Sequence, residues 1–524
     1  MEALPKRVRP QVGGWLARGR EAMDRLAVLE HERERLEREN ACLREMLRLA
    51  NLKRYGPRNE ALNSDQLELL KLEPSVAPAE VETEAALPEG AKREATAMRS
   101  RKGRHPGRTE LPAHLPRVEQ EVLFEEQERC CPQCGERRVP MGFETSEHLD
   151  CEPAKYFVRV LRREKLAPCR CESCVPMTAP VPGARIVEKG KLSDAIVVDL
   201  LVNKYANHLP LYRQALILRR EAGIELSQAT VGGIVMRVGD LMCALSGAMR
   251  EELLAGDYIQ GDETPVKVQC MPGSKRTHQS WMFEYSRPCG PVVFDFRMGR
   301  GRDGPQEFLD GWVGTLQSDG YAVYSHLGNG ITHAACLAHA RRKFHEAHQV
   351  AKEDPRPLEV LEVIAKIYTV EAHAREQGMD WAERLALRQA ESRPQMEKLR
   401  ELIERLAAQV LPQSATGKAC KYALGLWPRL ERFLEDGQVE LDNNWCENAM
   451  RPLALGRKNW MFLGSAAAGP RTAAIVSVFE TCRRLDVNVR EYLLDVLPRL
   501  ADWPAQRVGE LTPSAWLAAR KASG

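Results

Sequence analysis

Residues 441–464 read LDNNWCENAMRPLALGRKNWMFLG, and the rest of the chain is interpreted from this stretch. Residues 442–444 (Asp-Asn-Asn) are of the types that begin helices, so Glu447 falls in the first helical turns. The two asparagines and Arg451 lie three or four residues from Glu447, which places all four on one helix face. Pro452 disfavours a smooth continuation, so we expect a short, kinked helix. Alone, this window is typical of a capped surface helix. Two further acids upstream, where strands are expected, favour a functional role for Glu447.

Length and composition limit the possible classes of protein. A chain of 524 residues is too long for one hydrophobic core, so we expect several domains. No apolar run reaches membrane-spanning length and no secretory signal opens the sequence, so we expect neither a membrane span nor export. The net charge is +3 although Lys and Arg total 76, so a basic surface must be local. Of fifteen cysteines, seven lie between Cys130 and Cys174, which favours metal binding in a reducing compartment.

The N-terminal region carries a heptad repeat over residues 21–52, with Asn40 at the apolar seam. We predict an N-terminal coiled coil within residues 1–70 that joins two or more copies of the chain; the alternative is a solitary helix packed on its own core. Residues 71–115 have no period and contain a basic run from Lys92 to Arg108. They predict a linker with a basic arm that suits phosphate backbones, or a solvated linker with no partner.

Two C-x-x-C pairs, Cys131 with Cys134 and Cys171 with Cys174, predict a zinc-binding unit over residues 116–182. Four thiolates can surround one tetrahedral Zn²⁺. Cys169 is an alternative to Cys171, because the sequence CRCESC offers two ways to form the second pair. Buried reduced thiols or a disulfide are the remaining interpretations.

Residues 183–250 read as helices, with starts at Ser193 and Ser227 and a stop at Gly223. The helix, glycine turn and helix order resembles a helix-turn-helix, whose last helix enters a major groove. A helical scaffold without DNA contact is the alternative, since Gly232 and Gly233 weaken the last helix.

The pattern then changes to strands separated by Gly and Pro turns. We expect a three-stranded antiparallel meander, a helix, a strand that ends at Asp319, a further strand and a basic helix. This order indicates a multidomain α+β protein whose catalytic core is a ribonuclease-H-like mixed sheet. The expected ranges are strands at 257–268, 278–286 and 291–298, a helix at 305–312, a core of 251–350 with 437–485, a helical insertion of 351–436 and a C-terminal element of 486–524.

Three acids are candidates for the catalytic and metal-binding groups of that core. Asp262 lies on its first strand, Asp319 ends its fourth and Glu447 lies on its late helix. Carboxylates that converge are costly unless something neutralises them, and two Mg²⁺ ions, with Mn²⁺ as a substitute, do so with hard oxygen ligands. Such a pair of ions supports phosphodiester displacement. Composition alone also admits other acids as ligands: Asp257, Glu263, Asp295 and Asp442.

Several longer motifs together resemble the pattern of bacterial insertion-sequence sixty-six family transposases over nearly the whole chain. They are YGPRNEAL (55–62), CPQCG (131–135), KYANHLPLYRQ (204–214), GDETPV (261–266), SDGYAVY (318–324), CLAHARRKF (336–344), DNNWCENAMRPLALGRKNWMFLGS (442–465) and ELTPSAW (510–516). The resemblance implies a DDE transposase with Asp262, Asp319 and Glu447 as its triad and with zinc at the cysteine pairs. The YGPRNEAL segment departs from the family's serine-containing form.

The resemblance also implies how such an enzyme works and what it meets. Water frees a 3′-hydroxyl at the element end, and that hydroxyl then attacks target DNA at the same metal pair. The implied partners are terminal inverted repeats, target DNA, a second copy of the chain and small accessory proteins of the element, in the bacterial cytoplasm at the nucleoid and away from membranes. The basic residues expected to contact phosphates are Arg341, Arg342, Lys343, Arg457 and Lys458, with a solvated basic face as the alternative.

Some interpretations stay open at this point. A zinc-containing DNA-binding regulator with an inactive nuclease fold is the rival function, and a junction nuclease or integrase shares the same fold. Cys336 and His339, with His345 and His348, form either a metal site or structural contacts. Trp460 either stacks on an extruded base or packs in the core.

Overall fold

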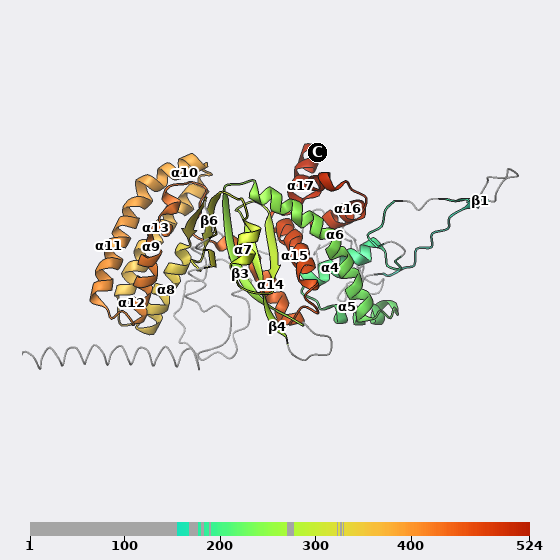
Figure 1. Cartoon of the computed structure of the whole chain (residues 1–524), viewed down its shortest axis with the longest axis horizontal. Coiled ribbons are helices and arrows are strands. Elements are labelled where there is room, and N and C mark those ends of the chain that lie inside the picture. Colours follow the sequence, from blue (N-terminus) through green and yellow to red (C-terminus); the bar gives the residue numbers. More distant parts are fainter. Residues whose placement is uncertain are drawn as a thin grey trace, which may run out of the picture. The chain divides into compact units, whose positions relative to one another are not determined.

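The structure is a computed structural model of the chain (Figure 1). It describes residues 155–166, 177–179, 183–187, 190–269, 277–321, 323–324, 327–328 and 330–523. The expected coiled coil, the basic arm and the four zinc-binding cysteines lie outside these residues. The chain divides into two units, and residues 155–162 belong to one while the described residues from 163 onward belong to the other. The unit that contains the described residues from 163 onward includes a small antiparallel pair, β1 (Lys165–Leu166) and β2 (Met177–Thr178).

Five strands of the described chain form one mixed sheet in the order β5-β4-β3-β6-β7. The first three form the predicted antiparallel meander, and β6 and β7 add to β3 in parallel. The sheet therefore confirms the ribonuclease-H-like arrangement expected from the order of the elements. The strands are β3 (Tyr258–Val268), β4 (His278–Ser286), β5 (Val292–Arg297), β6 (Gly314–Ser318) and β7 (Ile331–Ala335), with the helix α7 (Asp303–Phe308) before β6.

In the described part of the chain, three helices precede the sheet, and their ends follow the predicted signals. The hydroxyls of Ser193 and Ser227 accept hydrogen bonds from the first turns of α4 and α6, and Gly223 ends α5 at a φ of +67°. Helix α6 packs against the sheet and a later helix, so most of its length is scaffold. The three are α4 (Asp194–Tyr205), α5 (Leu211–Ala222) and α6 (Gln228–Leu254).

Helix α6 corrects one expectation from the sequence. Among the described residues it is a helix with the length and mean hydropathy (1.3) of a membrane span. A helix in the core of a protein has the same composition, and the apolar side chains of α6 lie in the main hydrophobic core with the sheet. Its hydropathy is therefore weak support for a membrane span.

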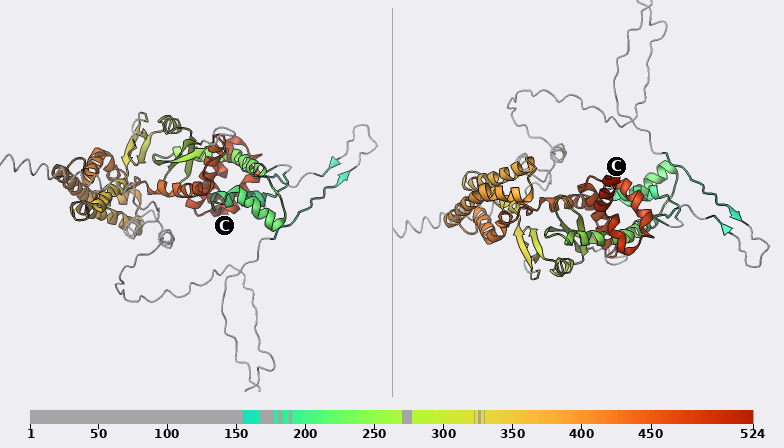
Figure 2. Two further views of the ribbon diagram at one scale, coloured as in Figure 1. Left: turned by 90° about the horizontal axis from the view of Figure 1, so that it is seen from below. Right: turned by 90° about the horizontal axis from the view of Figure 1, so that it is seen from above.

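A helical insertion follows β7, drawn from yellow to orange in Figures 1 and 2. Its amphipathic helices form a core of their own, with Ile364, Leu399, Ile403 and Cys420 at its centre. The same cluster includes Ala334 and Ala335 of β7, so this core continues onto the sheet edge. The basic helix α8 (Leu337–Val350) belongs to the predicted core range and packs against this insertion. The elements of the insertion are α9 (Arg356–Glu376), α10 (Trp381–Leu387), the π-helical η3 (Arg388–Ser392), α11 (Arg393–Gln409), α12 (Ala415–Gly425), α13 (Trp427–Leu430) and the 3₁₀ turn η4 (Arg432–Leu434).

The chain then returns to the sheet through two helices. Helix α14 packs on β3 and β4, and α15 packs on β5 and α6. The outer strand β5 is not an open edge there, because the amides of Val292 and Phe294 donate to the hydroxyls of Thr481 and Ser477. The last elements are α14 (Asn444–Trp460), α15 (Ala468–Arg484), α16 (Val489–Leu500), the 3₁₀ segment η5 (Ala505–Leu511) and α17 (Pro513–Ser523).

The prediction that α14 is short was wrong. The helix begins at Asn444 as expected but runs through Pro452 to Trp460. Proline has no N–H for the carbonyl four residues before it, which is the carbonyl of Asn448. The guanidinium of Arg483 donates to that oxygen at 3.1 Å, so the missing helical hydrogen bond is replaced. The helix ends at Met461, whose φ is +61°.

Candidate active site

The parallel register of β3 and β6 brings Asp262 and Asp319 to one edge of the sheet. Gln260 lies directly opposite Gln317 in that pair. Each aspartate follows its glutamine by two residues, and residues two apart on a strand share a face. Gly320 then turns the chain at a φ of +87°, and the carboxylate of Asp319 accepts a hydrogen bond from the amide of Tyr321 at 2.8 Å. Asp319 therefore stands at the first bend beyond the strand.

Glu447 comes to the same region on the first turn of α14. Two side chains of α8 lie beside it: Nε2 of His339 is 3.5 Å from Oε1, and Nη2 of Arg342 is 3.6 Å from Oε2. Both distances exceed those of good charge-assisted hydrogen bonds. Oε1 of Glu447 is buried and has no hydrogen-bond partner. One oxygen of this partly exposed carboxylate thus retains unused acceptor capacity.

The charges of the site act on one another. Burial raises the pKa of Asp262 well above its usual range, and the nearby carboxylates of Glu447, Glu263 and Asp319 raise it further. Burial also lowers the pKa of His339, although Glu447 opposes that shift. The imidazole is therefore largely neutral at neutral pH and adds little positive charge. The negative charge of Asp262 is therefore disfavoured both by burial and by its acidic neighbours.

The donor set fits a hard divalent cation. Carboxylate oxygens are the ligands that Mg²⁺ and Mn²⁺ prefer. A cation would stabilise both Oε1 of Glu447, which accepts no hydrogen bond, and the charged form of Asp262. In the described residues, however, no group of three or more His, Cys, Asp or Glu side chains is close enough to hold a metal ion. The carboxylates would have to move closer together to share one.

The rival acids are occupied elsewhere or exposed. Glu263 accepts hydrogen bonds from Arg300 and Tyr324 at 2.6 and 2.8 Å. Asp295 pairs with Arg297 at 2.7 Å. Of the two others, Asp442 accepts from Tyr368 and from the amide of Asn444, whereas Asp257 is exposed at the start of β3.

The basic residues expected to contact DNA differ in their surroundings. Arg341 is buried, and its guanidinium lies over the ring of Tyr368. Arg457 donates to the hydroxyl of Thr264 and the carbonyl of Pro265. These two therefore offer less surface to a phosphate than the exposed Arg342, Lys343 and Lys458.

The structure also shows the surroundings of Cys336, His339 and Trp460, whose roles the sequence left open. The Cys336 thiol accepts a hydrogen bond from the amide of Asn443, and His339 faces Glu447, so both lie next to the α14 start. They do not gather with His345 and His348 into a metal site. Trp460 packs partly buried against the core between α14 and β5, and Lys204 lies over its ring at 5.7 Å.

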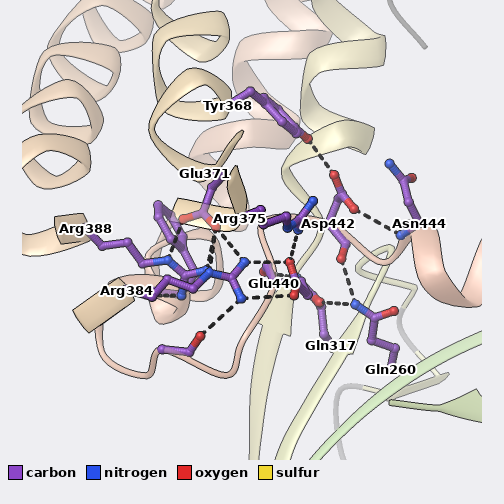
Figure 3. Close-up of polar contacts among 12 residues, drawn as sticks. Gln260, Gln317, Tyr368, Glu371, Arg375, Arg384, Arg388, Glu440, Asp442 and Asn444 are labelled. Atoms are coloured by element: carbon purple, nitrogen blue, oxygen red, sulfur yellow. Dashed lines mark hydrogen bonds and ion pairs between the residues drawn. The ribbon is translucent and has the colours of Figure 1, made fainter. Parts of the chain in front are cut away.

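Sequence reasoning missed the polar side chains beneath the acids. Gln260 and Gln317 are fully buried and hydrogen-bonded to each other and to the segment that leads into α14 (Figure 3). A signal was present, because YIQGD and TLQSD both place a glutamine two residues before the aspartate. It missed the buried acid Glu284 as well, which lies opposite Asp262 in the β3–β4 pair.

Comparison with known proteins gives four consecutive family matches. Residues 42–119 match a model described as "Transposase C of IS166 homeodomain", and residues 128–172 match the "zinc-finger binding domain of transposase IS66". Residues 189–471 match "Transposase IS66 family", and residues 477–514 match "IS66 C-terminal element". The zinc-finger match includes Cys169 and Cys171 and stops before Cys174.

Relatives cover the chain almost from end to end. The uncharacterized protein y4qI of Sinorhizobium fredii is 32% identical over 495 residues, which is 90% of this chain and 88% of that protein. The uncharacterized protein y4hP of the same organism is 31% identical over 91% of this chain and 89% of its own. A solved structure, the Drosophila P element transposase strand transfer complex, matches at a TM-score of 0.27 and 10% identity over 56% of this chain and 93% of its own, a likeness too low to carry weight. The transposase model matches more than half of this chain, and the chain therefore belongs to the IS66 family of transposases.

Proposed function

We propose that the chain is a DNA transposase that binds insertion-sequence ends and catalyses metal-dependent strand cleavage and strand transfer. The observation that carries the proposal is the approach of Asp262, Asp319 and Glu447 from two parallel strands and a helix, with charges that act on one another. Other acids of the region are exposed or already paired, which supports this triad over its rivals.

All three residues of the triad supply carboxylate ligands in this mechanism. Asp262 and Asp319 present their carboxylates from neighbouring strands, and Glu447 supplies a third from α14. Two bound Mg²⁺ or Mn²⁺ ions would activate the attacking oxygen and stabilise the leaving oxygen of an in-line displacement. His339 borders Oε1 of Glu447 as a largely neutral ring, so the charged neighbour of this carboxylate is Arg342 at Oε2. Water in the first step and the freed 3′-hydroxyl in the second would attack at this same site.

Binding of DNA rests on groups outside the triad. Arg342, Lys343 and Lys458 offer exposed cations, which suit phosphate contacts whose strength falls with salt. Zinc at Cys131, Cys134, Cys171 and Cys174 and the N-terminal coiled coil would add the end-binding and pairing functions. The matched zinc-finger and N-terminal models support both additions. The partners are element ends, target DNA, a second copy and accessory proteins, in the bacterial cytoplasm at the nucleoid.

Replacing Glu447 by Gln tests the triad. The substitution keeps the size of the side chain but removes the charge that a divalent cation needs. We expect Mg²⁺-dependent cleavage of a labelled element end to fall by roughly 10²-fold or more, while the dissociation constant for that end changes little. Cleavage and binding are measured on the same preparation of the full-length protein.

Glu263→Gln is the matched control, because Glu263 neighbours Asp262 in sequence but points to Arg300 and Tyr324. We expect it to lower stability by about 1–3 kcal/mol through the weakened buried contact and to cleave within a few-fold of the unmodified protein. Normal cleavage by Glu447→Gln, with loss in Glu263→Gln, would show that the triad is misassigned.

A further inference from the structure

Three buried side chains form a hydrogen-bonded group directly behind the two aspartates. We name Tyr258, Gln260 and Gln317 the amide cluster. The hydroxyl of Tyr258 donates to Oε1 of Gln317 at 2.5 Å, and Nε2 of Gln260 donates to the same oxygen at 2.9 Å. All three lie on the strand faces that carry Asp262 and Asp319, because each is an even number of residues away from its aspartate.

The amide cluster holds the main chain that leads into α14. Nε2 of Gln317 donates to the carbonyl of Glu440 at 2.7 Å, and Nε2 of Gln260 donates to that of Asp442 at 2.8 Å. The amide of Glu440 donates to the hydroxyl of Tyr258 at 3.1 Å. The amide of Cys446, the residue before Glu447, donates to Oε1 of Gln260 at 3.3 Å. The main-chain groups of this segment are thus hydrogen-bonded by side chains, where a strand would use the main chain of a neighbouring strand.

The helical insertion holds the same segment from its other side (Figure 3). The guanidinium of Arg384 on α10 bonds to the carboxylate of Glu440 at 2.7 Å and to that of Glu371 on α9 at 2.5 Å. Arg375 also pairs with Glu440. Two residues further on, the carboxylate of Asp442 accepts a hydrogen bond from Tyr368 of α9 at 3.0 Å. The segment is therefore fixed between the strands and the insertion.

We propose that Tyr258, Gln260 and Gln317 are positioning residues that set the distance between the two strand aspartates and Glu447, with the insertion as the opposing support. The proposal rests on the triad of the proposed function. Its physical basis is that the side-chain amide of Gln260, on the strand of Asp262, bonds both to Gln317 on β6 and to the start of α14. The three elements that carry the acids are therefore held together by one side chain. Partners behind the ligands of a metal commonly change its affinity about 10–100-fold.

The proposal predicts a change in metal binding that a loss of stability alone would not give. Tyr258→Phe removes one oxygen from the amide cluster and keeps the ring. We expect Mn²⁺ binding to the full-length protein, followed by the signal of free Mn²⁺ in electron paramagnetic resonance, to weaken about tenfold or more. The Mg²⁺ concentration for half-maximal cleavage should rise by a similar factor, while the dissociation constant for element-end DNA stays the same.

Tyr492→Phe provides a matched control elsewhere in the molecule. Tyr492 is also fully buried, and its hydroxyl donates to the carbonyl of Leu511 at 2.6 Å, on the C-terminal side of the core. Tyr492→Phe loses one buried phenolic hydrogen bond and Tyr258→Phe loses three, so both variants should unfold at a lower temperature. Tyr492→Phe should bind Mn²⁺ like the unmodified protein.

A second variant, Gln317→Met, removes the amide that reaches Glu440 and tests the same idea from the neighbouring strand. If both Tyr258→Phe and Gln317→Met bind Mn²⁺ normally, whereas Asp262→Asn and Glu447→Gln do not, the positioning role is refuted and the triad stands. If the two acid variants also bind Mn²⁺ normally, the triad itself is wrong and the positioning role fails with it. Weakened binding in either cluster variant, with Tyr492→Phe unchanged, supports the proposal.

Discussion

Glu284 illustrates how a single buried acid can affect the region around the triad. Its side chain is fully buried, touches the Cys446 thiol and lies near Arg484. Burial raises the pKa of Glu284 from its usual 4.5 to about 7, although the nearby Arg484 acts in the opposite direction. One of its oxygens has no hydrogen-bond partner. The charged form is thus poorly accommodated, and the neutral acid suits the site better.

This pKa predicts how Glu284→Gln changes stability with pH. A raised folded-state pKa contributes stability that is complete below the unfolded value near 4.5 and is lost as the pH rises through about 7. Glutamine resembles the neutral acid at every pH. We expect the melting temperatures of the two proteins to agree near pH 4 and to diverge by pH 8. At pH 8 the free energy of unfolding of the variant should be the larger, by at most on the order of 3 kcal/mol. Parallel melting curves across this range would contradict the raised pKa.

Some residues of the site could be predicted from the sequence and others could not. Asp262, Asp319 and Glu447 could be nominated because Asp262 lies on a recognisable strand, Asp319 follows the end of one and Glu447 follows a helix start. The roles of Gln260 and Glu284 depend on partners 182 and 162 residues away, Asp442 and Cys446. Local patterns contain no information on such distant pairs. The buried position of Arg341 was missed for the same reason, because its partner Tyr368 lies on another helix.

At the level of elements, the strands were predicted within a residue or two, since alternation and Gly or Pro turns are local properties. The end of α14 was not. Pro452 is a local signal to stop, but the carbonyl of Asn448 that it leaves without a donor is satisfied by Arg483 from α15, 35 residues away. A tertiary contact therefore overrode a local rule that was applied correctly.

The insertion supplies a prediction at this scale, through the ion pairs of Arg384. This guanidinium is buried between Glu371 and Glu440, whose carboxyl pKa values lie below their usual range because the nearby arginines outweigh burial. Arg384→Met leaves both acids with one cation fewer. We expect a loss of about 3–5 kcal/mol in the free energy of unfolding, measured by urea denaturation at pH 7. Lowered pKa values give stability above the usual range of the acids, so the loss should shrink in acid.

Arg400→Met is the control for the insertion. Arg400 forms an exposed ion pair with Glu404 one turn along α11, and such pairs contribute little. The variant should unfold like the unmodified protein. A large effect there, or none for Arg384→Met, would mean that the buried pairs do not hold the insertion together.

At the scale of the whole molecule, the sheet is completed by segments from both sides of the insertion. Strands β3 to β7 end at residue 335, yet α14 and α15 cover the sheet only after residue 443. The order of core strands, helical insertion and late core helices could be predicted, because the strand patterns, the helical patterns and the acids follow one another in this order along the sequence. The coiled coil and the zinc unit stay predictions, because the heptad residues and the zinc-binding cysteines lie outside the described residues. Both predictions rest on the sequence and the family matches.

The zinc unit offers a test of how well spacing alone selects metal ligands. Two C-x-x-C pairs predict about one Zn²⁺ per chain at Cys131, Cys134, Cys171 and Cys174. The family match stops at residue 172, which keeps Cys169 as a rival. We expect mass-spectrometric metal analysis to find less zinc in Cys134→Ser and Cys174→Ser, because each removes a thiolate from a closed tetrahedral site. Cys169→Ser should retain its zinc, as should Cys243→Ser, which alters an exposed free thiol on α6. Zinc lost from Cys169→Ser but kept by Cys171→Ser would move the second pair, and a folded, zinc-free unmodified protein would exclude the site altogether.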